Sequence, residues 1–442
     1  MIRIIPRLAA MLSAALLVLA GFSFRRSFAQ APSTTVVMTG AQLIDGTGRP
    51  PLEQAILVIS NGRIEAVGAS NAVNVSAGAV RVDMSGKTIM PGLINTLGHV
   101  SATLDKGSES SVHGHMMEQL RVYAAYGVTT VLSFGMAPAD ESENLKLRDE
   151  LAHQPLDGAR LYTGGLNAVG NTPEEARKSA DRLADLKVDV IKFAANGTPK
   201  DMTPETYGAI IDEAHKRGIK TAVRLNFLKD AKEAVEKGVD SISQSVRDQD
   251  IDQALIAELK RRNVFYIPAL TRDLSVSLYE TTPEFFTDPF FLRGNSVFRN
   301  EVEQLKDPAL QEKTRNSKAV QAAKQALQQD IRNLKILSDA GVQIAMGTDS
   351  GAPVGRWQGY FEHTELEMMV KAGMTPMQVI VSATGGAARA INLDKQLGTL
   401  EPGKMADLLV LKANPLTDIR NSRQIDSVWI GRHRLVREPR DH

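Results

Sequence analysis

The sequence predicts an α/β fold, either a parallel barrel or a doubly wound sheet, with further strands at both ends of the chain. Three observations indicate this fold class. Apolar runs of strand length alternate with helical stretches through the middle of the chain. Several of those stretches begin with Thr-Pro and stop near a glycine, as α-helices do. Strand-like runs without helices between them stand before and after this region.

The first residues are predicted to be a signal peptide, residues 1–31. Arg3 and Arg7 precede the apolar run 8–22, and small residues suited to cleavage follow it. The run is shorter than the roughly 20 apolar residues that a membrane-spanning helix needs. We therefore expect an exported protein, periplasmic or secreted, with no membrane partner once the signal is removed. A retained N-terminal membrane anchor is the alternative.

Strands are expected at both ends of the mature chain. The N-terminal runs lie at 35–43, 55–59, 64–67 and 80–84, and the C-terminal runs lie at 406–411 and 425–430. The pair Asn61-Gly62 between two of these runs predicts a tight hairpin, because both residues tolerate the positive φ of its turn. We expect the two terminal segments to pack together as one small sandwich.

The middle of the chain is expected to alternate between strands and helices. Strand-like runs stand at 128–134, 188–193, 220–225, 264–270 and 342–346. Thr172, Thr203 and Thr375 each precede a proline and predict helix starts, because threonine caps a helix and proline fits its first turn. Glycines stand where such helices are expected to end, at Gly218, Gly238, Gly341 and Gly373.

Composition excludes several kinds of partner. With 43% hydrophobic and 23% charged residues, the chain resembles an ordinary soluble globular protein. A formal charge of +1 provides no basic excess for counterion release, so we expect a small-molecule ligand and no nucleic acid. The chain has no cysteine, which excludes disulfides and a lipid-modified N-terminal cysteine.

Several collinear segments resemble the amidohydrolase superfamily, and its imidazolonepropionase- and prolidase-like branch most closely. They are Met90–Ile94, Gly127–Val131, Asp189–Lys192, Gly347–Ser350, Glu365–Met368, Ala372–Pro376 and Gly398–Leu408. The resemblance implies a (β/α)8 TIM barrel beside a composite β-sandwich made from both termini. It places the barrel at 92–394 and the two parts of the sandwich at 32–91 and 395–442.

The resemblance also implies a metal site whose ligands this chain has mostly lost. Metal-dependent members hold one or two divalent ions at the C-terminal ends of barrel strands, with four histidines, a lysine that is often carboxylated and an aspartate. The matching positions here are Leu97, His99, Lys192, Arg224, Gln244 and Asp349. Three of the four histidines are therefore replaced, which leaves His99, Lys192 and Asp349 as candidate ligands and Asp349 as the candidate general base.

Arg224 opposes metal binding more than a missing ligand does. Its guanidinium stays protonated in proteins and places a fixed positive charge where a cation would bind. Two unit charges 4 Å apart repel by roughly 4 kcal/mol at an effective dielectric of ~20, about three decades of affinity. We therefore expect no metal, or a single weakly bound divalent ion such as Zn²⁺. An ion pair between Arg224 and Asp349 is expected to replace metal coordination, and a carboxylate-bearing ligand suits this pocket.

Three further features allow alternatives. His113 and His115 repeat the His-x-His spacing and are either relocated metal ligands or polar residues that open a surface helix. His363, together with Arg224 and Gln244, is a candidate for substrate binding, or else it packs a helix. The aromatic stretch 278–298 forms a lid over the pocket, or it packs against the outer barrel or a second subunit of a homo-oligomer.

Two functional hypotheses follow. By resemblance, the chain is an exported hydrolase of carbon–nitrogen bonds in amides, cyclic amides or dipeptide-like molecules, with metal-dependent turnover weak or lost. In that case Asp349 acts as the base, and Arg224 and Lys192 stabilise an oxyanion. The alternatives are a non-catalytic barrel that binds a small anion, or a hydrolase with a relocated or single weak metal site.

Overall fold

The computed structural model describes residues 35–69, 72–73, 78–104, 110–197, 201–352, 354–431 and 433–435. The predicted signal peptide lies outside these residues. Among the described residues, no helix is both long and apolar enough to span a bilayer.

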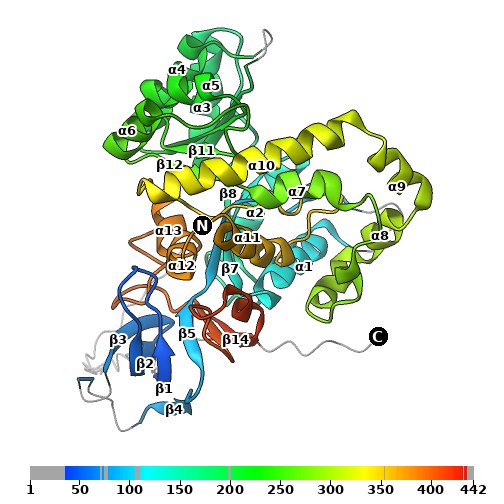
Figure 1. The fold of residues 1–442 in the computed structure, drawn as a ribbon. Helices are drawn as coiled ribbons and strands as arrows, with labels where there is room; N and C mark the ends of the chain where they lie inside the picture. The colour runs from blue at the N-terminus through cyan, green and yellow to red at the C-terminus, as the bar shows by residue number, and fades with distance from the viewer. Residues whose placement is uncertain are drawn as a thin grey trace, which may run out of the picture. The chain divides into compact units, whose positions relative to one another are not determined.

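Strands from both ends of the chain form one eight-stranded sheet (Figure 1). Its order is β15-β14-β13-β5-β1-β2-β3, and β4 pairs with β1. The strands are β1 (Val36–Leu43), β2 (Leu52–Ser60), β3 (Arg63–Ala69), β4 (Val80–Asp83), β5 (Thr88–Pro91), β13 (Leu408–Leu411), β14 (Ile425–Ile430) and β15 (His433–Leu435). Because β5 pairs with both β1 and β13, the two terminal segments join edge to edge.

The predicted hairpin is present between β2 and β3. Asn61 and Gly62 both have positive φ values, 51° and 77°, as the tight turn requires. The apolar side chains of the sheet pack into one cluster that includes Met38, Leu57 and Trp429. The β domain built from both ends of the chain is therefore confirmed.

Parallel strands make up the centre of the fold. The strands β6 (Leu93–Gly98), β7 (Val128–Phe134) and β8 (Arg160–Gly165) form one sheet, and β9 (Val190–Ala195), β10 (Lys220–Leu225), β11 (Ser241–Ser243) and β12 (Phe265–Ile267) form another. All of their pairings are parallel.

Backbone hydrogen bonds connect these two sheets into a ring. Residues 343–350 lie between β12 and β6: the amide of Ala345 donates to the carbonyl of Tyr266 (3.1 Å), and the amide of His99 donates to the carbonyl of Ser350 (2.9 Å). Between β8 and β9, the amide of Asp189 donates to the carbonyl of Thr163 (2.8 Å). Eight parallel segments thus follow one another as in a (β/α)8 barrel, whose catalytic groups lie at the C-terminal strand ends.

Helices follow the strands. They are α1 (Val112–Ala125), α2 (Pro138–Leu151), α3 (Pro173–Asp185), α4 (Pro204–Lys216), α5 (Leu228–Lys237), α6 (Gln253–Arg262), α7 (Leu270–Leu278), α8 (Asn295–Leu305), α9 (Pro308–Arg315), α10 (Lys318–Asp339), α11 (Tyr360–Lys371), α12 (Pro376–Ser382) and α13 (Gly385–Ala390). The three Thr-Pro predictions are confirmed: the Thr172, Thr203 and Thr375 hydroxyls accept hydrogen bonds from backbone amides in the first turns of α3, α4 and α12.

The aromatic stretch packs against its own barrel. Phe286 and Phe291 are buried and meet the ring of Trp357 edge-on, with centroids 5.7 and 5.2 Å away. Phe291 also meets Tyr360 of α11 at 5.1 Å. This stretch therefore builds one wall beside the strand ends, and Phe298 lines the cavity described below.

Candidate functional site

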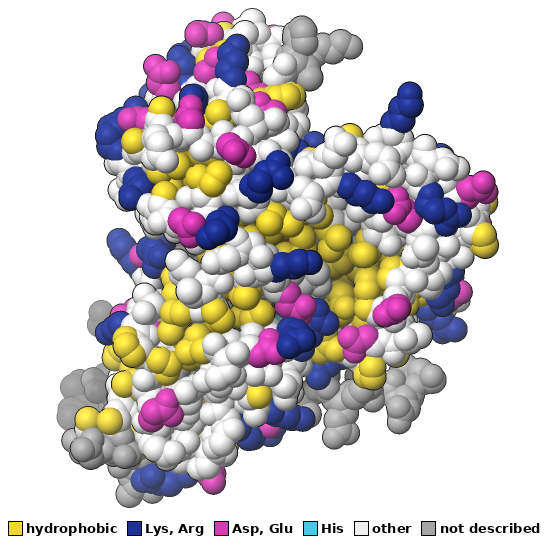
Figure 2. All heavy atoms as spheres, viewed as in Figure 1, with side chains coloured by type: hydrophobic (Ala, Val, Ile, Leu, Met, Phe, Trp, Pro, Cys, Tyr) yellow, Lys and Arg dark blue, Asp and Glu magenta, His cyan; other side chains and the backbone are white. Residues whose placement is uncertain are grey.

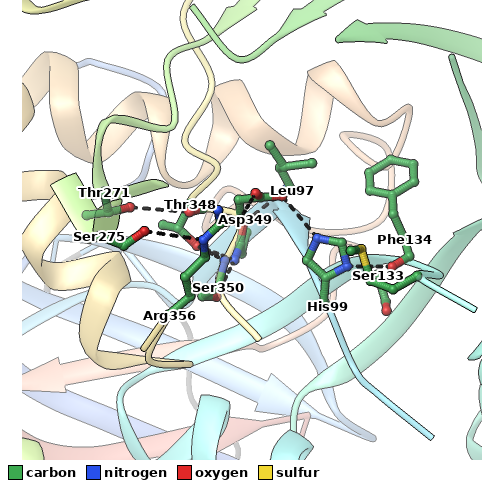
Figure 3. A network of polar contacts seen from close by, with 12 residues as sticks. Leu97, His99, Ser133, Phe134, Thr271, Ser275, Thr348, Asp349, Ser350 and Arg356 are labelled. Carbon is green, nitrogen blue, oxygen red and sulfur yellow. Dashed lines mark hydrogen bonds and ion pairs between the residues drawn. The ribbon is translucent and has the colours of Figure 1, made fainter. Parts of the chain in front are cut away.

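Six side chains mark the strand ends where the resemblance implies a metal centre. Leu97 and His99 end β6, Lys192 lies on β9, Arg224 on β10, Gln244 directly after β11 and Asp349 in the segment 343–350. The two ends of the ring meet at His99 and Asp349, which lie side by side (Figure 3).

His99 is held between two acceptors. Its Nδ1 lies 2.6 Å from the carbonyl oxygen of Phe134, and its Nε2 lies 3.0 Å from Oδ1 of Asp349. These two contacts fix the orientation of the imidazole between the end of β7 and residues 343–350.

Asp349 is paired with Arg356, which the sequence analysis did not identify. Its Oδ2 contacts Nη1 of Arg356 (Figure 3), so the expected ion pair of Asp349 with Arg224 is wrong. Burial alone would raise the pKa of Asp349, but the His99 hydrogen bond and the charges of His99, Arg356 and Lys192 hold it well below its usual range. Asp349 is thus ionised and a weak base.

Two of the strand-end residues have positive φ values, which residues other than glycine rarely adopt. Asp349 has φ +59° and Gln244 has φ +77°. Such conformations cost free energy and persist where the surrounding structure enforces them, most often at functional sites. The amide of Asp349 donates to the carbonyl of Leu97 (2.7 Å), and that of Gln244 donates to the carbonyl of Ile267 (2.9 Å). These bonds to neighbouring strands fix both side chains at the barrel mouth.

Lys192 and Arg224 are cations that form no ion pair with any described residue. Lys192 Nζ lies 4.1 Å from the ring centroid of Phe134 and makes no hydrogen bond or ion pair with any described residue. Burial and the charge of Arg224 lower the pKa of Lys192 to about 8, against the opposing effect of Asp349. Nε of Arg224 is buried and has no hydrogen-bond partner in the described part of the chain. Burial and the neighbouring arginines lower the pKa of Arg224.

The residues present do not fit the divalent ion of the family. Leu97 is fully buried in apolar surroundings and cannot ligate a metal. Both oxygens of Asp349 already have partners, His99 and Arg356. Oε1 of Gln244 is buried and has no hydrogen-bond partner among the described residues, but a neutral amide oxygen is a weak metal ligand. Across the described ranges, no group of three or more His, Asp or Glu side chains is arranged to hold an ion.

The side chains of His113 and His115, the alternative His-x-His pair, do not point toward a common site. His113 is exposed on α1 and lies 3.3 Å from Glu150, whereas His115 lines a cavity. On a helix, residues two apart point in different directions, so the spacing that serves a strand cannot chelate one ion here. The helical reading of this segment is the one the structure supports.

His363 lies away from the strand-end site. Its Nε2 donates to the carbonyl of Tyr126 (2.7 Å), and its Nδ1 lies 2.9 Å from the hydroxyl of Ser422. Burial lowers the pKa of His363 to about 3, and the charges of Arg423 and Arg293 act in the same direction. His363 is therefore a neutral packing residue, and the structure does not bring it to the predicted substrate site.

A cavity of about 300 Å³ adjoins His99 and Arg356. Its apolar walls come from α8 and the loop before α11, at Val297, Phe298 and Trp357. No local sequence pattern predicts this cavity, because its lining residues come from separate loops and helices.

A buried polar network holds the segment around Asp349 from behind. Oε1 of Glu362 accepts hydrogen bonds from the side chains of Asn95 (2.5 Å), Ser350 (2.7 Å) and Thr348 (3.1 Å). Burial raises the pKa of Glu362 to about 7, although these hydrogen bonds lower it. Asn95 lies on β6 and Glu362 on α11, so the network fixes both neighbours of Asp349 in the sequence to two elements of the fold.

Stability should fall as pH rises through 7 because of Glu362. Between pH 4.5 and about 7 the folded state binds more protons than the unfolded state, so the free energy of unfolding decreases with pH there. A shift from 4.5 to about 7 corresponds to about 3 kcal/mol for a fully buried carboxyl. Urea unfolding at pH 5 and pH 8 should show a smaller loss in Glu362→Gln than in the wild type.

Glu365 supplies the contrasting variant. Burial raises its pKa to about 7 as well, but its oxygens accept from the amides of Leu270 (2.8 Å) and Thr271 (2.7 Å). A glutamine amide would direct N–H groups at one of these donors, so Glu365→Gln should destabilise the protein at both pH values. Equal pH dependence in wild type and Glu362→Gln would contradict the assignment of this titration.

Comparison with known proteins gives the family. The model of the amidohydrolase family matches residues 88–432. The 5-methylthioadenosine/S-adenosylhomocysteine deaminase of Symbiobacterium thermophilum is 23% identical over 412 residues, covering 86% of this chain and 85% of that protein. The imidazolonepropionase of Agrobacterium fabrum is 24% identical over 412 residues and covers 86% of this chain and 90% of that protein.

Solved structures agree on the fold. A Xaa-Pro dipeptidase with bound methionine superposes with a TM-score of 0.71 at 21% identity, covering 90% of this chain and 98% of that one. The ochratoxinase of Aspergillus niger gives 0.69 at 18% identity, covering 91% and 95%. Both likenesses concern the fold alone, and with the match over residues 88–432 they confirm the predicted α/β barrel with its β domain. This chain belongs to the amidohydrolase family.

Proposed function

We propose that this protein binds a small carboxylate-bearing amide at its strand ends and that its metal-dependent turnover is weak or lost. Arg224 carries the proposal: its guanidinium has no ion pair with any described residue, and its buried Nε has no partner. A buried donor without a partner costs free energy, which a ligand carboxylate recovers through charge-assisted hydrogen bonds. Lys192 and Gln244 are the further contacts we propose for this ligand.

The amide part of the proposal rests on the family. The deaminase and dipeptidase among the similar proteins bear names of reactions at carbon–nitrogen bonds. A fold hosts many chemistries, so the family narrows the ligand class without establishing turnover. We further propose that the chain is exported after loss of residues 1–31, in which case sequencing of the mature protein should begin near residue 32.

Slow hydrolysis without a metal is the second candidate. The cavity is lined by His99 and Arg356, the two side chains that contact Asp349, and in this candidate it would hold the amide and the attacking water. Water would attack the amide carbon while Asp349 takes its proton and then delivers it to the leaving nitrogen as the carbon–nitrogen bond breaks. Arg224 and Lys192 would stabilise the oxyanion. The low pKa of Asp349 makes it a poor base, which favours binding over turnover.

Calorimetric titration with N-acetylglycine and N-acetylglycinamide tests the proposal, because the two differ only in the carboxylate. We expect binding of the carboxylate and weaker or undetectable binding of the neutral amide. Arg224→Gln should weaken carboxylate binding by about 10- to 100-fold, since a hydrogen bond to a charged group contributes about 1.5–3 kcal/mol.

Arg217→Gln is the matched control. Arg217 lies at the end of α4 and pairs with Asp181 and Asp185, with 39% of its side chain exposed. Its removal should leave both stability and binding nearly unchanged. If the neutral amide bound as tightly as the acid, or Arg224→Gln bound like the wild type, carboxylate binding at this site would be excluded.

A further inference from the structure

The strand-end site is part of a larger group of cations, which we name the basic sector. It consists of Lys192, Arg224, Arg247, Arg272 and Arg356. These residues come from β9, from β10, from the loop after β11, from α7 after β12 and from the loop after residues 343–350. The C-terminal ends of neighbouring parallel strands meet at one mouth, so the sector covers consecutive strand ends.

Arg224 lies within the field of the other arginines. Burial lowers the pKa of Arg224 most, the charges of Arg272, Arg247 and Arg356 lower it further, and the charge of Asp349 opposes them. On the face drawn in Figure 2, acidic and basic side chains are interspersed, and the formal net charge of the whole chain is only +1. The positive excess at the strand ends is therefore a local feature.

Two carboxylates make the only ion pairs of the basic sector among the described residues. Arg247 and Arg272 both contact Oδ1 of Asp273. Arg356 shares Asp349 with His99. Lys192 and Arg224 have no ion pair with a described carboxylate, so three of the five cations lack a counter-ion of their own.

Asp330 does not supply the missing negative charge. Its side chain is fully buried beside Asp273, and burial together with the charge of Asp273 raises its pKa to about 10. Asp330 is therefore protonated at neutral pH. The three positive charges remain uncompensated.

Burial makes this excess costly in the absence of a ligand. Only 14% of the Arg247 side chain, 18% of Arg272 and 15% of Arg356 are exposed. Nε of Arg272, like Nε of Arg224, is buried and has no partner in the described ranges. Buried positive charges require counter-ions and buried donors require acceptors, and a carboxylate serves as both, because guanidinium groups bind carboxylates in a paired geometry.

We propose that the natural ligand carries at least two negative charges and is a small dicarboxylate or tricarboxylate. This inference rests on the carboxylate binding proposed above and narrows its class. One carboxylate on Arg224 would leave excess positive charge around Lys192 and Arg272, whereas a second or third carboxylate would neutralise it. The separate strand ends that carry these cations suit carboxylates spaced along a short carbon chain.

The test compares butyrate, succinate and tricarballylate, which carry one, two and three carboxylates on short aliphatic chains, by titration calorimetry at constant ionic strength. Affinity should rise at least tenfold from butyrate to succinate and again to tricarballylate. In Arg224→Gln the increase in affinity from butyrate to tricarballylate should be at least fivefold smaller than in the wild type, and in Arg217→Gln it should be unchanged. Nε of Arg224 has no hydrogen-bond partner among the described residues, so we expect Arg224→Gln to fold, which circular dichroism checks.

Each other outcome overturns the inference. Equal affinity for the three acids, with N-acetylglycine still bound, would reject the multiple charge and keep the proposed function. No binding of the three acids or of N-acetylglycine would reject both. Tighter binding of inorganic phosphate than of tricarballylate, measured in the same buffer, would assign the basic sector to phosphate esters instead of carboxylates.

Discussion

Replacing Arg356 together with three strand-end residues should give this chain a stoichiometric metal ion. The variant Leu97→His, Arg224→His, Gln244→His, Arg356→Ala restores the four histidines and frees Oδ2 of Asp349. The triple histidine variant should bind far less, because Arg356 still places a cation on the aspartate that must ligate the metal. One such like charge at about 4 Å costs roughly 4 kcal/mol at an effective dielectric of ~20, about three decades of affinity.

Elemental analysis of the purified proteins for Zn, Mn, Fe, Co and Ni is the measurement. The wild type should contain well below a tenth of an ion per chain after incubation with these metals, and the fourfold variant should approach one. A near-stoichiometric ion in the wild type would overturn our interpretation of Leu97, Arg224, Gln244 and Arg356. An empty fourfold variant with native circular dichroism would show that the strand-end positions are misassigned.

Removing both carboxyls of the buried pair Asp273 and Asp330 should destabilise the protein strongly. Asp273 binds Arg247 and Arg272, and protonated Asp330 lies against it. The double variant Asp273→Asn, Asp330→Asn leaves two buried arginines without a carboxylate. Breaking a buried ion pair in this way costs about 3–5 kcal/mol. Urea unfolding at pH 7 measures this loss.

The single variant Asp330→Asn is the control for that experiment. Its amide N–H takes the place of the carboxyl proton, so we expect a change below about 1 kcal/mol. Asp273→Asn alone should fall between the two, because Asp330 can ionise once the neighbouring charge is gone. A loss in Asp330→Asn as large as in the double variant would show that Asp330 is ionised in the folded protein.

Local sequence patterns determined the elements of this fold well. The runs 128–134, 220–225 and 425–430 are strands with those bounds, and the three Thr-Pro pairs begin helices. Each of these signals depends on residues close together in the chain, such as a threonine capping its own helix. The run 264–270 gave only the short strand β12, because the chain turns at Ala269, where φ is +50°.

The positions of the strand-end residues could also be predicted from the sequence, because the family motifs indicate which residue ends each strand. His99, Arg224, Gln244 and Asp349 lie at or just beyond the ends of barrel strands, and Lys192 lies within β9. The surroundings of His363 could not be predicted in this way, because the motif places the residue on α11 but does not determine the direction of its ring. In the fold it points to Tyr126 and Ser422.

Only the tertiary structure decided how the charges at the barrel mouth are paired. Arg356 forms an ion pair with Asp349 because the loop after residue 350 folds back over the strand ends. Asp273 lies beside Asp330 because α7 packs on α10. Ion pairing depends on distances of a few ångströms between residues far apart in the sequence, and no local pattern encodes them. The sequence by itself therefore determined which residues stand at the family's metal-ligand positions, Leu97, Arg224 and Gln244 among them. The packing of loops and helices determined which of the neighbouring cations have carboxylate partners.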